Sequence, residues 1–183
     1  RIAGFVGLAT SYVLLSGGSA QAALGVTAST DAAAMAQALL GPGANLVPGS
    51  ASYIGASGAS GFFSGDTSLF GQPSGVSGVL LTSGSINNAL PPNNSSSASS
   101  NNGFGGSSYL SGLIGGATTL DASTLTFKVT LDPGTSGLEW TYVFGSEEYN
   151  EFVNSNFNDV FALSLDGANL ALVPSTTTPV SIN

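Results

Sequence analysis

The chain contains no cysteine and no histidine among its 183 residues. Disulfide bonds, thiol nucleophiles and serine or cysteine catalysis with a histidine base are therefore excluded. Zinc, iron or copper held by histidine or cysteine is excluded for the same reason. The remaining chemistry depends on carboxylates, amides, hydroxyls and backbone carbonyls, which are hard oxygen ligands suited to Ca²⁺ or Mg²⁺.

Charge is also scarce, and positive charge most of all. Only 7% of the residues are charged, and Arg1 and Lys128 are the only cations against ten acids, which gives a net charge of −8. Proteins that bind nucleic acid neutralise phosphates with a basic surface, so we expect no nucleic-acid partner. The negative charge also opposes binding to an anionic membrane surface.

Residues 1–22 have the pattern of a secretory signal peptide. Arg1 stands for a basic n-region, an apolar run follows over residues 2–15, and small residues lead up to Ala22. The apolar run is shorter than the ~20 residues that span a membrane. We therefore expect cleavage after Ala22 and a secreted chain, in some cases anchored at the cell surface. Membrane contact is expected only through this segment or through a C-terminal anchor missing from the sequence.

Residues 23–183 are predicted to form a single β-rich domain. An alanine-rich helix is predicted over residues 29–40, capped by Ser29 or Thr30, with its small apolar stripe packed on a sheet. After it, short apolar runs alternate with glycine and serine turns. The predicted strands cover residues 46–47, 52–54, 61–64, 79–83, 125–131, 138–144, 160–165, 170–173 and 180–182. The expected fold is mainly β, an antiparallel, jelly-roll-like β-sandwich with one N-terminal helix packed on it.

Two of these strands alternate most cleanly. In residues 125–131 every second side chain is apolar, and residues 138–144 alternate in the same way. A turn at Asp132-Pro133-Gly134 separates them, so we predict that the two strands pair as a hairpin. Residues 91–108 lack charge and periodicity and are predicted to form a flexible loop within the domain. Because a further strand begins at residue 180, we expect the domain to be truncated at its C-terminus.

The densest chemistry lies between Thr141 and Leu165. Glu147 and Glu151 are four residues apart, so in a helical turn they would repel each other by ~0.2–0.5 kcal/mol. A bound Ca²⁺ would remove this repulsion, and nearby asparagines offer further oxygens. The candidate metal ligands are Glu147, Glu148, Glu151, Asn158 and Asp159, with Tyr149, Phe152 and Phe157 as the packing that fixes the loop. The alternative is that these acids and asparagines are solvated or hydrogen-bonded loop residues.

An enzyme is a further alternative. Two carboxylates among Glu139, Glu147, Glu148, Glu151 and Asp159 could act as a glycosidase pair. Adjacent Glu147 and Glu148 point to different faces of an extended strand, which weakens that pair. Trp140 and Tyr142 could stack on a sugar, although their spacing beside Leu138 favours a core position.

The sequence resembles the choice-of-anchor L domain of bacterial secreted proteins. The motifs that carry the resemblance are SEEY-x-EF at residues 146–152, FNDVF at 157–161 and NLALVPSTTTPVSIN at 169–183. Upstream, ALLGPGANLV at 38–47, GVLLTSGS at 78–85 and LDASTLTFKV at 120–129 are also similar. The resemblance covers about residues 30–183 and implies a secreted or surface-anchored β-rich domain, but no particular activity.

The function expected from these observations is binding without catalysis. Low charge, serine- and glycine-rich loops and secretion favour a module of the extracellular matrix or an adhesion-type protein, with Ca²⁺ organising its acidic loop. Its expected partner is an extracellular polysaccharide or a protein. The alternatives are a carboxylate-based enzyme that acts on glycans and a self-assembling structural protein of the surface.

Overall fold

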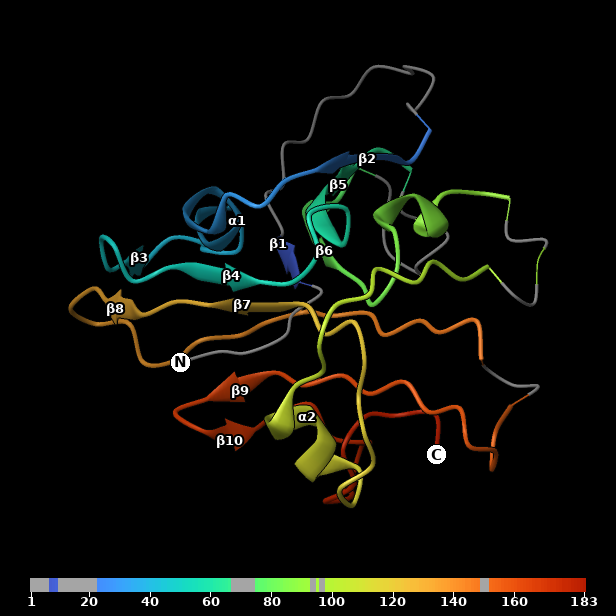
Figure 1. The fold of residues 1–183 in the computed structure, drawn as a ribbon. Coiled ribbons are helices and arrows are strands. Elements are labelled where there is room, and N and C mark those ends of the chain that lie inside the picture. The colour runs from blue at the N-terminus through green and yellow to red at the C-terminus, as the bar shows by residue number, and fades with distance from the viewer. Residues whose placement is uncertain (1–6, 10–22, 67–74, 93–94, 96–97, 149–151) are drawn as a thin grey trace.

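A computed structural model describes residues 7–9, 23–66, 75–92, 95, 98–148 and 152–183 of the chain. Short antiparallel strands dominate it, and the helices are few and short (Figure 1). The strands are β1 (Gly7–Ala9), β2 (Gly25–Ala28), β3 (Ala44–Leu46), β4 (Ser52–Ile54), β5 (Ser60–Ser64), β6 (Ser77–Leu81), β7 (Thr124–Thr126), β8 (Val129–Leu131), β9 (Ser164–Leu165) and β10 (Ala168–Asn169). The helices are α1 (Ala32–Ala38), the 3-10 turn η2 (Ile86–Ala89) and α2 (Ser108–Leu113).

All the strand pairs are antiparallel. One sheet has four strands in the order β1-β6-β5-β2, and the pairs β3-β8, β4-β7 and β9-β10 form three smaller sheets. The mainly β, antiparallel class predicted from the sequence is therefore confirmed, with sheets that are small for a sandwich. None of the helices in the described part of the chain is long and apolar enough to span a membrane.

Helix α1 confirms the predicted alanine-rich helix and its apolar stripe. Met35 and Ala36 are fully buried, and the helix contacts β3, β4, β6 and β7. The N-cap is Asp31, whose Oδ1 accepts a hydrogen bond from the Ala34 amide at 3.0 Å, and not Ser29 or Thr30 as expected. A carboxylate at this position also interacts favourably with the helix dipole, and Ser29 supports it by accepting a bond from the Asp31 amide.

Two apolar clusters form the core. The larger joins α1 to β6, β7 and the last part of the chain, and the smaller lies on the opposite face of β6, since Val79 and Leu81 belong to the larger and Leu80 to the smaller. The larger contains Met35, Ala36, Leu39, Val79, Leu81, Leu125, Phe127, Phe161, Leu163 and Ala171, and the smaller contains Leu24, Phe63, Val76, Leu80 and Ile86. The larger cluster thus brings helix α1 into contact with residues near the end of the chain.

The predicted strand over residues 125–131 is broken in two, and the predicted hairpin with residues 138–144 is wrong. Strand β7 pairs with β4 and β8 pairs with β3, about 70 to 90 residues away in the sequence. The break between β7 and β8 lies opposite the turn between β3 and β4. There the Ser50 hydroxyl accepts a hydrogen bond from the Lys128 amide at 3.1 Å and donates one to the Val47 carbonyl. The Ser50 side chain therefore takes the place of a backbone hydrogen bond between the strands at this point.

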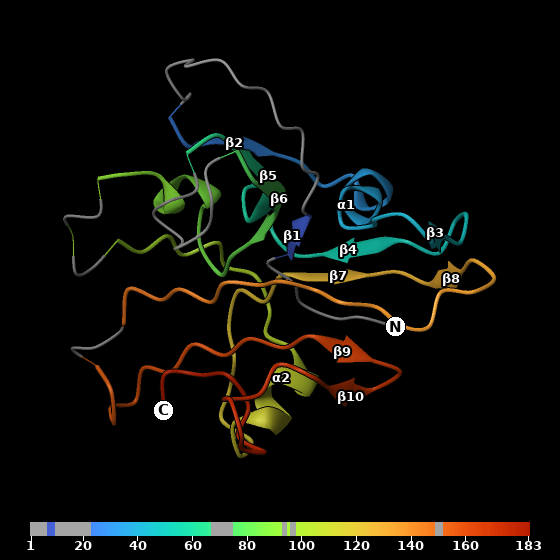
Figure 2. The same ribbon diagram turned by 180° about the vertical axis from the view of Figure 1, so that it is seen from behind.

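Residues 138–144 keep the predicted alternation but not the ladder. Leu138, Trp140 and Tyr142 are half-buried, whereas Glu139 and Thr141 are exposed. The segment lies between β7 and β9 in both views, and apart from a bridge at Thr141 no strand is assigned to it (Figures 1 and 2). The last part of the chain is held by the β9-β10 hairpin and by bridges between Val160 and Ser181 and between Leu172 and Pro179.

The loop that precedes α2 is fastened by Asp121. Its two carboxylate oxygens accept hydrogen bonds from the Asn102 amide at 3.1 Å and from the Phe104 amide at 2.6 Å. The Asn102 side chain donates in turn to the carbonyls of Ser83 and Gly84. These contacts attach the described residues 98–107 to the body of the domain.

Candidate functional site

The acidic stretch folds back so that Asp159 lies near Ser146 and Glu148. The Ser146 hydroxyl donates to Asp159 Oδ2 at 2.6 Å and accepts from the Glu148 amide at 3.1 Å, so it links the two ends of the loop. Glu147 lies next to them in the chain. The predicted ligand Glu151 and the predicted packing residue Tyr149 both fall outside the described residues.

The electrostatics of this group favour a proton or a cation. Partial burial, followed by the negative charges of Asp159 and Glu147, raises the pKa of Glu148 above its ordinary value. The Oε2 atom of Glu147 is buried and has no hydrogen-bond partner among the described residues. An unpartnered buried carboxylate oxygen is costly, so added positive charge would stabilise this loop.

The side chain of Asn158 holds this loop to the end of the chain by hydrogen bonds. Its Oδ1 accepts hydrogen bonds from the amides of Ile182 and Asn183, both at 3.1 Å. The Asn183 side chain donates back to the carbonyls of Ser155 and Phe157 and accepts from the Asn154 amide. The amide side chains therefore tie the acidic loop to the last residues of the domain.

The expectation that Phe157 is a core residue that fixes the loop is wrong. Its side chain is 58% exposed, and its ring packs edge-to-face with the Phe152 ring, with centroids 5.3 Å apart. Phe152 is half-buried. The turn around Val153 lacks a covering layer, so alternation of apolar and polar residues could not identify a buried side there.

The predicted metal ligands do not form a complete set in the part of the chain that is described. No group of three or more carboxylates is placed there to hold a metal ion. The charges of Asp159 and Glu147 act on Glu148, but Asn158 directs its side-chain oxygen toward the backbone amides of Ile182 and Asn183.

A second feature is an open apolar groove, which we call the Trp140 groove. It has a volume of about 440 Å³ and lies between β8, residues 137–142 and the β9-β10 hairpin. Its lining consists of Leu131, Gly137, Leu138, Glu139, Trp140, Tyr142, Leu163, Leu165 and Leu170. Leu131 and Leu170 remain 40% and 49% exposed, although both are leucines of strand-like segments.

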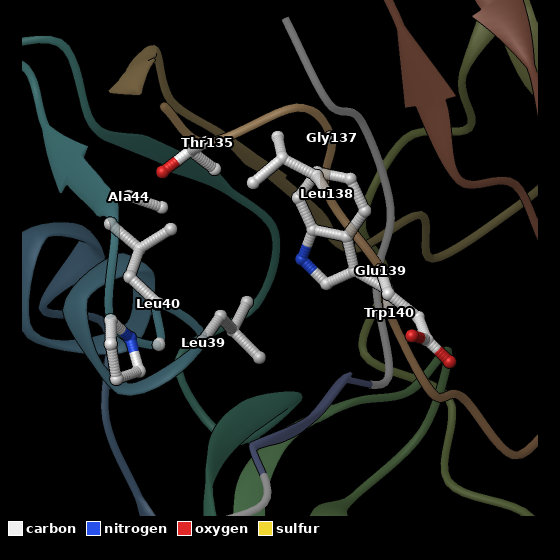
Figure 3. A pocket seen from close by; sticks show the side chains of 10 residues that line it. Leu39, Leu40, Ala44, Thr135, Gly137, Leu138, Glu139 and Trp140 are labelled. Carbon is white, nitrogen blue, oxygen red and sulfur yellow. The ribbon is translucent and has the colours of Figure 1, made fainter. Parts of the chain in front are cut away.

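A smaller cavity lies on the α1 side of the same segment. Its volume is about 130 Å³, and Leu39 and Leu40 face Leu138 and Trp140 across it (Figure 3). Figure 3 shows the indole nitrogen of Trp140 turned toward this cavity and the Glu139 carboxylate turned away from it. Residues 137–140 therefore form a wall with open space on both sides.

One acidic side chain lies beside the aromatic residues of the groove. Glu139 is the one acidic residue among the described residues that line it, and Glu147, Glu148 and Asp159 do not line it. From their spacing beside Leu138, Trp140 and Tyr142 were expected in the core, with contact to a sugar as the alternative. Alternation indicates which side chains share a face, but it cannot show that part of that face stays uncovered.

The comparison with protein families gives a match to the choice-of-anchor L domain over residues 26–183. No curated protein and no solved structure gives a significant match. The matched range includes α1, every strand from β3 onward, the acidic stretch and the Trp140 groove. Domains of this kind are modules of secreted or surface-associated bacterial proteins. The chain belongs to the choice-of-anchor L domain family.

Proposed function

We propose that this surface-associated module is secreted with removal of residues 1–22 and binds an extracellular protein partner through the Trp140 groove, without catalysis. The observation that carries the proposal is the uncovered groove itself. Trp140 and Tyr142 lie in it beside leucines that remain 40% and 49% exposed. Tryptophan and tyrosine in an apolar depression are typical of the centres of protein interfaces.

The charges of the groove indicate the chemistry of the partner. Glu139 is exposed, no basic side chain is present among the described lining residues, and the chain carries a net charge of −8. A complementary segment inserts an apolar or aromatic side chain among the leucines and places a lysine or arginine near Glu139. A polysaccharide would stack on Trp140, but its hydroxyl groups would find few polar side chains there.

The arrangement of carboxylates supports binding over catalysis. A glycosidase needs two carboxyl groups on either side of its substrate, ~5–10 Å apart. The described lining of the groove supplies only Glu139, and the other acids considered for such a pair belong to the acidic loop.

We further propose that Ca²⁺ organises the acidic loop, with Glu147, Glu148, Glu151 and Asp159 as ligands and Asn158 holding the loop to the end of the domain. The buried, unpartnered Oε2 of Glu147 and the raised pKa of Glu148 support this assignment. Ca²⁺ accepts six to eight oxygens in irregular loops, so carbonyl groups of the loop complete the set.

Calcium binding is tested by thermal unfolding with Ca²⁺ and with EDTA. At a free concentration of 100 times Kd, a ligand selective for the native state adds about 2.7 kcal/mol, or roughly 5–10 °C in Tm for a chain of this size. The double variant Glu147→Gln and Glu151→Gln loses this increase, whereas Asp132→Asn, an exposed acid on another turn, keeps it. Identical curves with and without Ca²⁺ would remove the metal from the account.

The groove is tested by selecting binders from a displayed random-peptide library. Wild-type protein enriches sequences in which an apolar or aromatic residue adjoins a lysine or arginine. Leu170→Asp places a charge in the groove and weakens these peptides by about tenfold or more, since one central contact typically contributes ~2 kcal/mol. The matched control is Leu120→Asp, because Leu120 is 72% exposed and does not line the groove.

Three results would contradict the groove proposal. They are a selection that enriches no motif, peptides that bind Leu170→Asp as tightly as wild type, and a glycan array that shows Trp140-dependent binding of polysaccharides instead. The last result would identify a carbohydrate module in place of a protein-binding one.

A further inference from the structure

Strand β1 occupies one edge of the four-stranded sheet and lies within the predicted signal peptide. It pairs with β6 in antiparallel register, with Gly7 opposite Val79, Leu8 opposite Gly78 and Ala9 opposite Ser77. Among the strands that the structure describes, the order β1-β6-β5-β2 places β1 as the neighbour of β6 on that side. Cleavage after Ala22 would therefore leave the outer hydrogen-bonding groups of β6 without a strand.

We propose that this freed edge of β6 (Ser77–Leu81) pairs with the β6 edge of a second copy in the secreted protein. The inference rests on the removal of residues 1–22 that the proposed function includes. The family match begins at Val26, so the domain shared by the family does not include residues 1–22.

The edge has none of the features that usually prevent pairing. Natural edge strands carry lysine, proline or bulges, which block the addition of another strand. The sequence of β6, SGVLL, contains neither charge nor proline, and β6 already accepts an antiparallel strand along residues 77–79. Four of its five residues are buried, so β6 is held in place by the core on both faces and presents a fixed backbone.

A second copy suits this edge because antiparallel pairing of a strand with itself is self-complementary. A two-fold axis through the pair places the same uncharged residues opposite each other, which avoids like charges across the ladder despite the net charge of −8. The sheets β2-β5-β6 of the two copies would join into one continuous antiparallel sheet.

Light scattering after size-exclusion chromatography tests the proposal on two forms of the chain, one starting at Arg1 and one starting at Ala23. The form from Ala23 associates as its concentration rises, with a limiting mass twice that of the monomer, whereas the form from Arg1 stays monomeric. Ser77→Lys in the form from Ala23 places a charge at the exposed start of β6 and lowers the dimer fraction by at least half. Thr27→Lys is the matched control, because Thr27 is exposed on β2 at the opposite edge of the same sheet, and it leaves the dimer unchanged.

The proposal is overturned if the form from Ala23 remains a folded monomer or if both forms dimerise equally. It is also overturned if Thr27→Lys and not Ser77→Lys abolishes association, since that result assigns the contact to β2. Sequencing the N-terminus of the secreted protein separately tests leader removal. Failure of secretion or cleavage is thus distinguishable from failure of β6 pairing.

Discussion

The contact between Asp121 and the loop before α2 gives a prediction with a magnitude set by two hydrogen bonds. Asp121 Oδ1 and Oδ2 accept from the Phe104 and Asn102 amides at 2.6 and 3.1 Å. Bonds to a charged acceptor contribute about 1.5–3 kcal/mol each, but this carboxylate is partly exposed and water replaces part of the loss, so we expect about 1 kcal/mol per bond. The backbone of Asp121 has φ of 50°, which aspartate and asparagine tolerate and which costs most other residues about 1–2 kcal/mol.

These terms predict an ordered pair of variants. Asp121→Asn keeps one acceptor oxygen and the backbone preference, so it lowers the free energy of unfolding by about 1 kcal/mol. Asp121→Ala loses both bonds and gains backbone strain, for a total of about 3 kcal/mol, or roughly 6–12 °C in Tm. Denaturant unfolding measures both, with Asp132→Ala as a control, since exposed Asp132 makes a single side-chain bond to Asn45. A loss below about 0.5 kcal/mol for Asp121→Ala would show that the loop is not held by this carboxylate.

The remaining predictions concern the core and the acidic loop. Met35→Ala, at a fully buried position, lowers the free energy of unfolding by about 2–5 kcal/mol, whereas exposed Gln37→Ala changes it by less than about 0.5, both by denaturant titration. Asn158→Ala leaves the Asn183 amide without its acceptor and removes one of the two acceptors of the Ile182 amide, which also donates to the Asp159 carbonyl at 3.1 Å, so it costs about 1 kcal/mol. Asn158→Asp keeps the acceptor oxygen and costs less, and equal losses would contradict the role of Oδ1. The raised pKa of Glu148 means that the native state binds its proton more tightly than the unfolded state, so this residue's contribution to stability is complete below the ordinary glutamate pKa and is lost as pH rises through the raised value. Glu148→Gln flattens that decline above about pH 4.5 in Tm measured against pH, and an unchanged slope would refute the assignment.

The sequence predicted well where the signal is local. The alanine run predicts α1, although not its cap at Asp31, and the β4 range of Ser52–Ile54 matches its prediction. Both depend on neighbouring residues alone. The family resemblance is confirmed as well, because SEEY-x-EF and FNDVF are specific motifs.

Long-range pairing could not be predicted from the same patterns. Residues 125–131 alternate as one strand, but they pair with two consecutive strands, and the Ser50 side chain fills the gap between them. A turn signal at Asp132-Pro133-Gly134 suggested a local hairpin, yet β3 and β4 take the available edges. Partner choice over such distances depends on the whole core, which no local pattern contains.

The candidate functional sites were predicted only in part, because long-range packing also determines which side chains stay uncovered. The sequence identified the acidic stretch, and the structure places Glu148 where the charges of Asp159 and Glu147 act on it. It did not predict the Trp140 groove, because Leu163 and Leu170 alternate as core residues do. Asp121 also carried no signal, since a single acid after a glycine-rich segment is a common feature of loops.

The most direct test of the binding account uses the only tryptophan of the chain. Trp140 lines the groove, so its fluorescence reports occupancy of that site without a label. Titration with a library-selected basic and apolar peptide should shift the emission in a saturable way and protect Trp140 from acrylamide quenching. Leu170→Asp should abolish both changes, and Leu120→Asp should preserve them. Peptide binding that leaves the emission and quenching of Trp140 unaltered would contradict the account, because the partner would then bind elsewhere on the domain.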